Sequence, residues 1–219
     1  SGRNLSLALL HPATATAEQP VSGVRPHAGV RPHASAPAPT PAARHPTHSA
    51  KHGPGWLFDR LSALHGVVLT HPRGKIAGTL YVLGDPNCPF CEEFYHRLAP
   101  SFKKIGKAGV RIVWSPVAFL KVSSIARAER ILAGGASALR ENETHFDALH
   151  ERGGLPDKPI VSEKSRVIAA TQAFFDSGIQ VATPTLVWRD RHGRAHFITG
   201  VPDNRQFGAA MATMAVGHK

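Results

Sequence analysis

Both cysteines of this 219-residue chain lie in one short motif, Cys88-Pro89-Phe90-Cys91. The apolar run Ile76 to Leu83 before the motif predicts a buried strand, and the pattern from Glu92 to Ile105 predicts an amphipathic helix. Two thiols at this spacing between a strand and a helix are typical of proteins that exchange thiols and disulfides. The motif therefore indicates redox chemistry at Cys88 and Cys91.

Helical geometry predicts different roles for the two thiols. Cys88 would lie at the helix start, where free N–H groups and the helix dipole stabilise a thiolate and strongly lower its pKa. Cys91 belongs to an apolar stripe that faces inward, together with Phe94, Leu98, Phe102 and Ile105. We expect Cys88 to be the exposed nucleophile and Cys91 to be the buried resolving thiol.

The residues beside the thiols add to this interpretation. Pro89 suits the first helical position, because it has no N–H to leave unpaired and its φ is already helical. Phe90 would present an apolar tip to an unfolded substrate. Part of the acidification of Cys88 would be opposed by three nearby carboxylates, those of Asp85, Glu92 and Glu93.

Three other interpretations of the cysteine pair stay open. It could be an inert structural disulfide, although so short a loop constrains the unfolded chain little. It could be half of a zinc site, with His96 loosely within range, although such a site needs four ligands and the chain has no other cysteine. It could also be a chance pair in a reduced cytosolic protein. We expect no metal and no cofactor here.

Residues 1–55 differ in composition from the rest of the chain. They hold nine of the 18 prolines and six of the 14 histidines, and a Val-Arg-Pro-His motif occurs twice. Such a segment cannot bury enough apolar surface to fold, so we expect a disordered Pro/Ala/His-rich linker. Its histidines could bind a transition metal weakly, although no two stand at fixed helical spacing.

The linker is also basic, within a chain of formal net charge +11. Five cations face the single acid Glu18, namely Arg3, Arg25, Arg31, Arg44 and Lys51. A basic segment can touch an anionic membrane or nucleic acid, but we favour a solvated tether and expect no nucleic-acid partner. The apolar run Leu5–Leu10 and the following Ala-x-Ala pattern resemble the end of a signal peptide, which would suit an exported protein.

The remaining sequence predicts an α/β domain. We expect a linker helix and loop over residues 56–74 and a catalytic domain over 75–219, with Pro100 kinking the helix after the cysteines. The other expected elements are a strand over 110–114, a helical insertion over about 123–178, a hairpin over 185–188 and 196–199, and a last helix capped by Asp203 and Gln206. This β-α-β, helical insert, β-β-α order is that of the thioredoxin fold.

A second signal is Thr183-Pro184-Thr185 at the start of the hairpin. Proline is tolerated at the first residue of a strand but poorly inside one. In the thioredoxin fold a cis proline stands here beside the two cysteines, so we expect a cis Thr183–Pro184 bond. The backbone of Thr183 and Pro184 would then contact an extended substrate chain.

Taken together, these segments resemble the periplasmic thiol:disulfide interchange proteins DsbG and DsbC, with DsbG the nearer. The resemblance covers roughly Trp56 to Met214 and rests on four segments: Gly84 to Cys91, Phe119 to Ala133, Val181 to Thr185, and Gly200 to Asp203. It implies a periplasmic protein that acts on unfolded or misoxidised exported proteins. It also implies recycling by a membrane reductase of the DsbD type.

The chain departs from this family at one point. Members dimerise through an N-terminal domain joined by a linker helix, and here the Pro/Ala/His-rich segment takes that place, so we expect a monomer. Two alternatives stay open. One is a monomeric thiol oxidase like DsbA. The other is a redox-inactive chaperone or scaffold of a secretion or conjugation apparatus.

Overall fold

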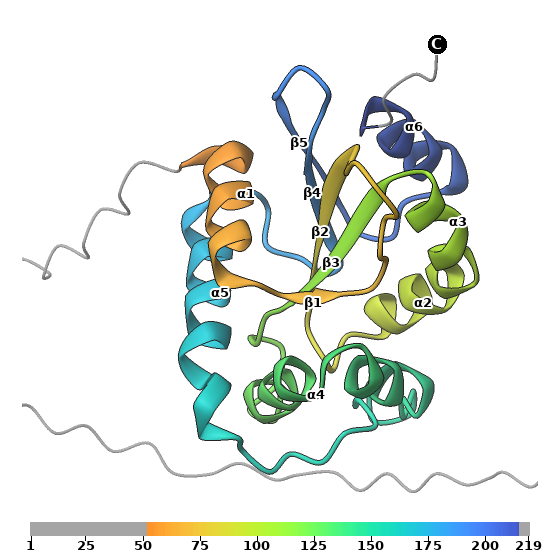
Figure 1. Cartoon of the computed structure of the whole chain (residues 1–219). Coiled ribbons are helices and arrows are strands. Elements are labelled where there is room, and N and C mark those ends of the chain that lie inside the picture. Colours follow the sequence, from red (N-terminus) through yellow and green to blue (C-terminus); the bar gives the residue numbers. More distant parts are fainter. Residues whose placement is uncertain (1–51, 215–219) are drawn as a thin grey trace, which may run out of the picture. The chain divides into compact units, whose positions relative to one another are not determined.

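The computed structural model describes residues 52–214, which form a five-stranded mixed sheet covered by helices (Figure 1). Most of the predicted 1–55 linker, with its apolar run and all of its histidines except His52, lies outside the described residues. The elements in chain order are α1 (Gly53–Leu64), β1 (Val67–Val68), β2 (Gly78–Gly84), α2 (Pro89–Leu98), α3 (Phe102–Lys107), β3 (Val110–Pro116), α4 (Ser124–Thr144), α5 (Lys164–Asp176), β4 (Thr185–Arg189), β5 (Ala195–Thr199) and α6 (Asn204–Met214).

The strands are arranged in the order β1-β3-β2-β4-β5. β2 is parallel to β3 and antiparallel to β4, and the β4–β5 hairpin is antiparallel. In the central register, Val82 lies opposite Trp114 on one side and Leu186 on the other. Because β2 is paired on both edges and covered on both faces, its apolar run is continuous rather than alternating.

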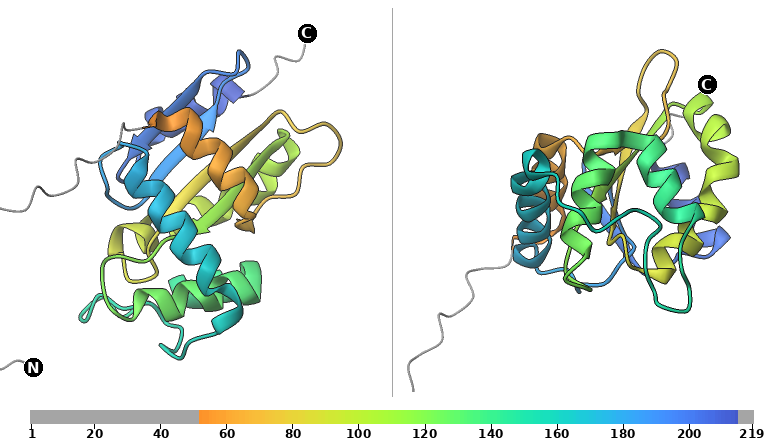
Figure 2. Two further views of the ribbon diagram at one scale, coloured as in Figure 1. Left: turned by 90° about the vertical axis from the view of Figure 1, so that its left-hand side faces the viewer. Right: turned by 90° about the horizontal axis from the view of Figure 1, so that it is seen from below.

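Helices cover the two faces of the sheet unequally. α1 and α5 lie side by side on one face, and α2, α3 and α6 lie on the other (Figure 2). Alternate residues of each strand point to opposite faces, so Leu80 and Val82 belong to one core and Tyr81 and Leu83 to the other. The motif that follows β2 therefore leaves the sheet at its most deeply buried strand.

The helix after the cysteines has the predicted break. α2 ends at Leu98, a 3₁₀ turn over Ala99–Ser101 contains Pro100, and α3 begins at Phe102. The inward stripe is confirmed, since its residues are buried except for Phe102, which is half-buried. The predicted capping box is confirmed as well, because Asp203 and Gln206 exchange two hydrogen bonds of 2.9 and 2.7 Å.

Other predictions need correction. α1 begins at Gly53, before the expected boundary at residue 55, and Pro54 occupies its first turn, where proline is tolerated. α1 also buries Leu57 and Leu61 completely against the domain. Strand β1 went unpredicted because two residues carry no periodicity, and β2 begins at Gly78 rather than at Ile76.

The helical insertion is only partly helical. α4 bends at Gly135, whose φ of 63° is left-handed, and residues 145–160 form a loop held by a bridge between Asp147 and Arg152. The expected helical face of Leu139, Phe146 and Leu149 is therefore wrong, and Leu149 is 87% exposed. Among the helices of residues 52–214, none combines the length and apolarity that a membrane span requires.

Candidate dithiol active site

The start of α2 positions the two cysteines. Cys88 is the N-cap residue and Pro89 the first helical residue, as predicted. The Cys88 N–H donates to the Asp85 carbonyl oxygen (3.0 Å), and the Cys88 carbonyl oxygen accepts from the N–H groups of Cys91 (3.0 Å) and Glu92 (3.2 Å). A tight turn followed directly by the first helical turn thus places both thiols at the carboxyl end of β2.

The exposure of Cys88 differs from the prediction. Both thiols are free, but Cys88 is only 3% exposed and Cys91 is fully buried. Phe90 instead forms the exposed tip, with 59% of its surface accessible, and Pro89 is half-buried. The helix start was expected to leave Cys88 in water, and the segment around Thr183 covers it, a contact that local periodicity does not reveal.

The predicted cis bond between Thr183 and Pro184 is present, and it lies beside the cysteines. The Cys88 thiol donates a hydrogen bond to the Thr183 carbonyl oxygen at 3.2 Å. The Pro184 carbonyl oxygen accepts from the Gly200 N–H at 2.8 Å, which ties this segment to the end of β5. The structure thus brings together all the residues that the sequence proposed for the site.

The two thiols have opposite pKa shifts. The pKa of Cys88 falls from 9.0 to about 7, mainly because the Cys91 thiol donates a hydrogen bond to it, while burial opposes the change. The Thr183 hydroxyl and the N–H groups of Cys91 and Phe90 lower it further. Burial raises the pKa of Cys91 well above its ordinary value. The helix start contributes as predicted, but the neighbouring thiol contributes more.

The nearby carboxylates are held away from the thiols or tied into hydrogen bonds. Glu92 and Glu93 pair with His96 (3.2 Å) and Arg97 (3.6 Å) one helical turn later. The His96 ring also contacts the Glu143 carbonyl oxygen at 3.1 Å. Within residues 52–214, no three His, Cys, Asp or Glu side chains gather at metal-binding distances.

Asp85 organises the loop in front of the motif. One of its oxygens accepts from the Asn87 N–H (2.9 Å) and the Ser124 hydroxyl (2.7 Å), and the other accepts from the N–H groups of Phe119 (2.8 Å) and Leu120 (3.0 Å). The residue is only 1% exposed. Asp85 therefore holds the motif and the start of the helical insertion together, a role that sequence analysis missed.

Two buried amide side chains, those of Asn87 and Asn142, extend the hydrogen-bond network of Asp85. The Asn87 side chain donates to Ser124 (2.9 Å) and accepts from the Gly153 N–H (3.1 Å), while Asn142 donates to the Pro86 carbonyl oxygen (3.0 Å). These contacts join three segments that are far apart in the chain. In the sequence, the only indication of these contacts was the polar segment Asp85 to Asn87, directly before the first cysteine.

Glu143 is the buried acid that sequence analysis missed. It is 1% exposed, and one carboxyl oxygen accepts from the Asn142 amide at 3.1 Å while the other has no partner. Burial raises the pKa of Glu143 to about 8, and the charge of Cys88 adds to the rise. Glu143 therefore shares a poorly solvated region with the thiols and retains its proton near neutral pH.

Exposed apolar side chains surround this end of the sheet. Phe90 forms the tip, the N–H of Leu120 donates to the Asp85 carboxylate, and Val181 precedes the cis bond by two residues. The Lys121 ammonium donates to the carbonyl oxygens of His150 and Glu151, which draws in the loop that carries Leu149. We call the following set the apolar rim: Phe90 (59% exposed), Leu120 (44%), Val122 (98%), Leu149 (87%) and Val181 (39%).

Comparisons with known proteins bear on the fold. No protein-family model matches the chain, and no curated protein matches its sequence. Among solved structures, a periplasmic thioredoxin-like protein from Salmonella enterica serovar Typhimurium is 19% identical, with a TM-score of 0.51 over 72% of this chain and 95% of that one. ScsC of Proteus mirabilis in a compact conformation is 18% identical, with a TM-score of 0.53 over 75% and 81%.

A third solved structure is the thiol-disulfide exchange protein alpha-DsbA2 from Wolbachia pipientis. It is 13% identical, with a TM-score of 0.53 over 72% of this chain and 91% of that one. At these identities the likeness concerns the fold. Together with the strand order and the cis bond beside the two cysteines, it shows that the described part of the chain has a thioredoxin-like fold with a helical insertion.

Proposed function

We propose that this protein is an exported, periplasmic thiol:disulfide oxidoreductase that reduces or isomerises disulfides of other proteins. One observation carries the proposal. The acidic thiol of Cys88 lies against the Thr183 carbonyl oxygen, and the protonated, buried thiol of Cys91 lies one helical turn behind it. An inert disulfide or a metal site would not need two thiols whose pKa values differ in this way.

The reaction then follows from the two environments. The Cys88 thiolate attacks one sulfur of a substrate disulfide, forms a mixed disulfide and releases the other substrate sulfur as a thiolate, which takes up a proton. Cys91 next attacks the Cys88 sulfur and releases the second substrate thiolate, which takes up the proton that Cys91 loses. Two electrons have moved to the substrate, and Cys88 and Cys91 form a disulfide. This second step follows the first because Cys91 can attack the Cys88 sulfur only once that sulfur is part of a disulfide.

The proposed direction rests on the pKa of Cys88. A more acidic nucleophile stabilises the reduced form, which makes the disulfide a stronger oxidant, as in DsbA with a pKa of about 3.5. The value of about 7 for Cys88 is nearer to that of thioredoxin, also about 7. This supports a reductase or isomerase, as in the DsbG-like interpretation, rather than a strong oxidase.

The proposed substrates are unfolded or misoxidised exported proteins. The apolar rim suits an exposed apolar stretch of polypeptide, because such surfaces are buried in folded proteins. The Thr183 carbonyl oxygen, which loses the Cys88 hydrogen bond when that thiol is deprotonated, would accept a main-chain hydrogen bond from an extended segment. By the family resemblance, a membrane reductase of the DsbD type would return the Cys88–Cys91 disulfide to the dithiol.

Insulin reduction with the full chain tests the function. We expect activity from the native chain, none from Cys88→Ser, and a stable mixed disulfide between Cys91→Ser and an unfolded client. Equal activity of the native chain and Cys88→Ser would instead indicate a redox-inactive scaffold. Equilibration with glutathione tests the direction, and a potential close to the DsbA value of about −120 mV would indicate an oxidase.

A further inference from the structure

A group of cations on the described part of the chain has no acidic counterpart. Residues 52–214 contain 20 lysines and arginines and 14 aspartates and glutamates. No acid occurs between Asp59 and Asp85, or between Glu93 and Glu129. These two stretches hold ten lysines and arginines, and we call five of them the basic cluster: Arg73, Lys75, Lys103, Lys104 and Lys107.

The fold brings the two stretches together. The Leu69 N–H donates to the Ile112 carbonyl oxygen (2.9 Å), and the Ala77 N–H donates to the Gly109 carbonyl oxygen (2.8 Å), so the loop between them lies along the junction of α3 and β3. The His71 backbone lies against Gly106, where an added Cβ would be 3.4 Å from the His71 carbonyl oxygen. Segments some thirty residues apart therefore form one surface.

This surface has the character of an anion site. All five residues of the basic cluster are exposed, and within the described structure none of them makes an ion pair with a carboxylate. A depression of about 300 Å³ is lined by His71, Arg73, Lys103 and Lys107. Uncompensated like charges repel one another, so a bound anion would relieve the repulsion.

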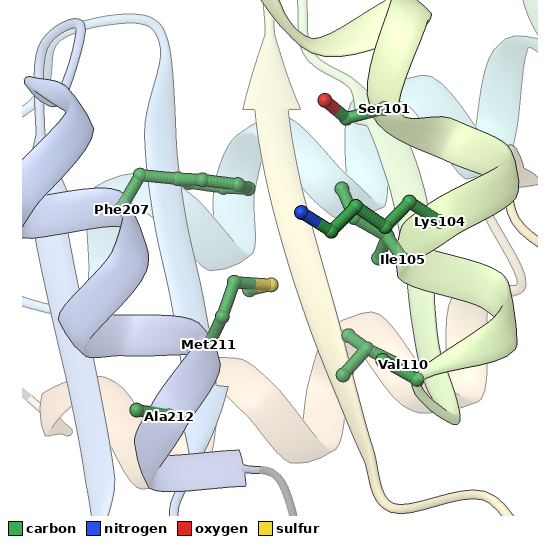
Figure 3. A pocket seen from close by; sticks show the side chains of 8 residues that line it. Ser101, Lys104, Ile105, Val110, Phe207, Met211 and Ala212 are labelled. Carbon is green, nitrogen blue, oxygen red and sulfur yellow. The ribbon is translucent and has the colours of Figure 1, made fainter.

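An apolar groove lies beside the cluster, between α3 and α6. It has a volume of about 390 Å³, and its lining includes Ile105, Val110, Phe207 and Met211. Lys104 extends from α3 toward α6 at its edge, so one member of the basic cluster borders the apolar wall directly (Figure 3). Cationic and apolar contacts are thus adjacent on one face.

The surface lies at the end of the sheet away from the dithiol. α3 leads into the first residue of β3, and Gly78 at the start of β2 adjoins Met214 of α6, whereas Cys88 follows the last residue of β2. The seven residues of β2 separate these ends by about 20 Å. A partner bound at the basic cluster would therefore leave the apolar rim free.

We propose that the basic cluster and the α3–α6 groove form a docking surface for an anionic lipid bilayer. Lipid phosphates would pair with the five cations, and an acyl chain or the upper part of one would enter the groove. A nucleic acid would use the charges but leave the apolar groove empty, so the combination favours an amphiphile. Docking in this way presents the dithiol to the solution rather than to the membrane.

Vesicle flotation of the full chain tests the charges. We expect binding to phosphatidylcholine vesicles that contain phosphatidylglycerol, and loss of binding at high salt. The triple variant Lys103→Glu, Lys104→Glu, Lys107→Glu should weaken binding by about 100-fold. Its matched control, Arg60→Glu, Lys158→Glu, Lys164→Glu, alters three exposed cations that lie outside α3 and α6 and should weaken it much less. If both variants lose the same amount of vesicle binding, the position of the charges does not matter and the proposal is wrong. Both variants keep the basic residues 1–51, so binding through that segment would not produce a difference between them.

A second pair of variants tests the groove and distinguishes a bilayer from a polyanion. Ala212→Trp fills the groove from an exposed position on α6, and Ala209→Trp places the same side chain on α6 outside it. We expect only Ala212→Trp to weaken vesicle binding. If the native chain binds duplex DNA more tightly than the vesicles, and Ala212→Trp changes neither, the surface is a polyanion site and the lipid proposal is wrong. Insulin reduction in solution should be unchanged in all four variants, which confirms folding.

Discussion

The Cys88 thiol donates a hydrogen bond to the Thr183 carbonyl oxygen at 3.2 Å, although 95 positions separate the two residues. A thiolate cannot donate, so deprotonation of Cys88 removes this bond and frees the carbonyl oxygen. An N–H of an extended client chain can then take its place, next to the nucleophile. Activation of the sulfur and opening of a main-chain contact for the client are therefore coupled.

The pKa of Cys88 should depend on Cys91. The Cys91 thiol makes the largest contribution to lowering it, so Cys91→Ala should raise the Cys88 pKa from about 7 toward 9.0. Thiolate absorbance during a pH titration measures this directly, and alkylation at pH 7 should become roughly five- to tenfold slower. Thr183→Val, which removes only a hydroxyl, should produce a smaller rise. An unchanged titration in Cys91→Ala would show that the helix start alone acidifies Cys88.

Glu143 should make stability depend on pH. Its pKa is about 8 in the folded chain and near 4.5 in the unfolded chain, so the folded state binds the extra proton between these values. The stability contribution is complete below pH 4.5 and is lost as the pH rises to about 8. Glu143→Gln should remove this pH-dependent loss. Between pH 4.5 and pH 9 the free energy of unfolding should therefore fall by about 2–4 kcal/mol less in this variant than in the native chain. Urea unfolding of the reduced protein at both pH values measures it.

The exposed neighbour Glu141 provides the control for this experiment. Glu141→Gln makes the same chemical change two residues away, at an exposed position, so its unfolding curves should follow the native pH dependence. If Glu143→Gln also keeps the native dependence, the Glu143 carboxyl is not held in its protonated form by the fold.

Asp85 should be required for the geometry of the loop before the dithiol. Both of its oxygens accept hydrogen bonds from donors that cannot turn away, including the N–H groups of Phe119 and Leu120. Asp85→Asn would aim an amide NH₂ at such donors and should destabilise the fold by about 3 kcal/mol, with a loss of insulin reduction. Asp203→Asn, at an exposed helix start, should cost less than about 1 kcal/mol. Denaturant unfolding of the two variants makes the comparison.

Gly153 should tolerate no side chain. A Cβ at this position would lie 2.1 Å from the Asn142 side-chain oxygen and 2.4 Å from the Pro86 carbonyl oxygen. Gly153→Ala should therefore separate the insertion from the motif and destabilise the protein by about 2–4 kcal/mol. Gly208→Ala on α6 meets open space and should stabilise by up to about 1 kcal/mol. Thermal unfolding distinguishes the two, and equal melting temperatures would contradict this account of the junction.

Local sequence patterns were sufficient for much of the fold. The stripe from Cys91 to Ile105, the break at Pro100 and the Asp203 capping box each depend on residues within one or two turns, and all three are present. The helical pattern gave a wrong prediction at Phe146 and Leu149. Apolar residues at helical spacing also occur in loops, and here the loop is held by the bridge between Asp147 and Arg152. Two-residue β1 lacked any periodic signal.

The sequence by itself determined the pair of thiols, the strand and helix that carry them, and the proline that stands beside them. Only the tertiary structure decided that Cys88 is buried, that Asp85 is a junction rather than a free charge, and that Glu143 lies near the thiols. The physical reason is that helix and strand periods report which residues share a face of one element. Burial and pKa depend on what a distant segment places against that face.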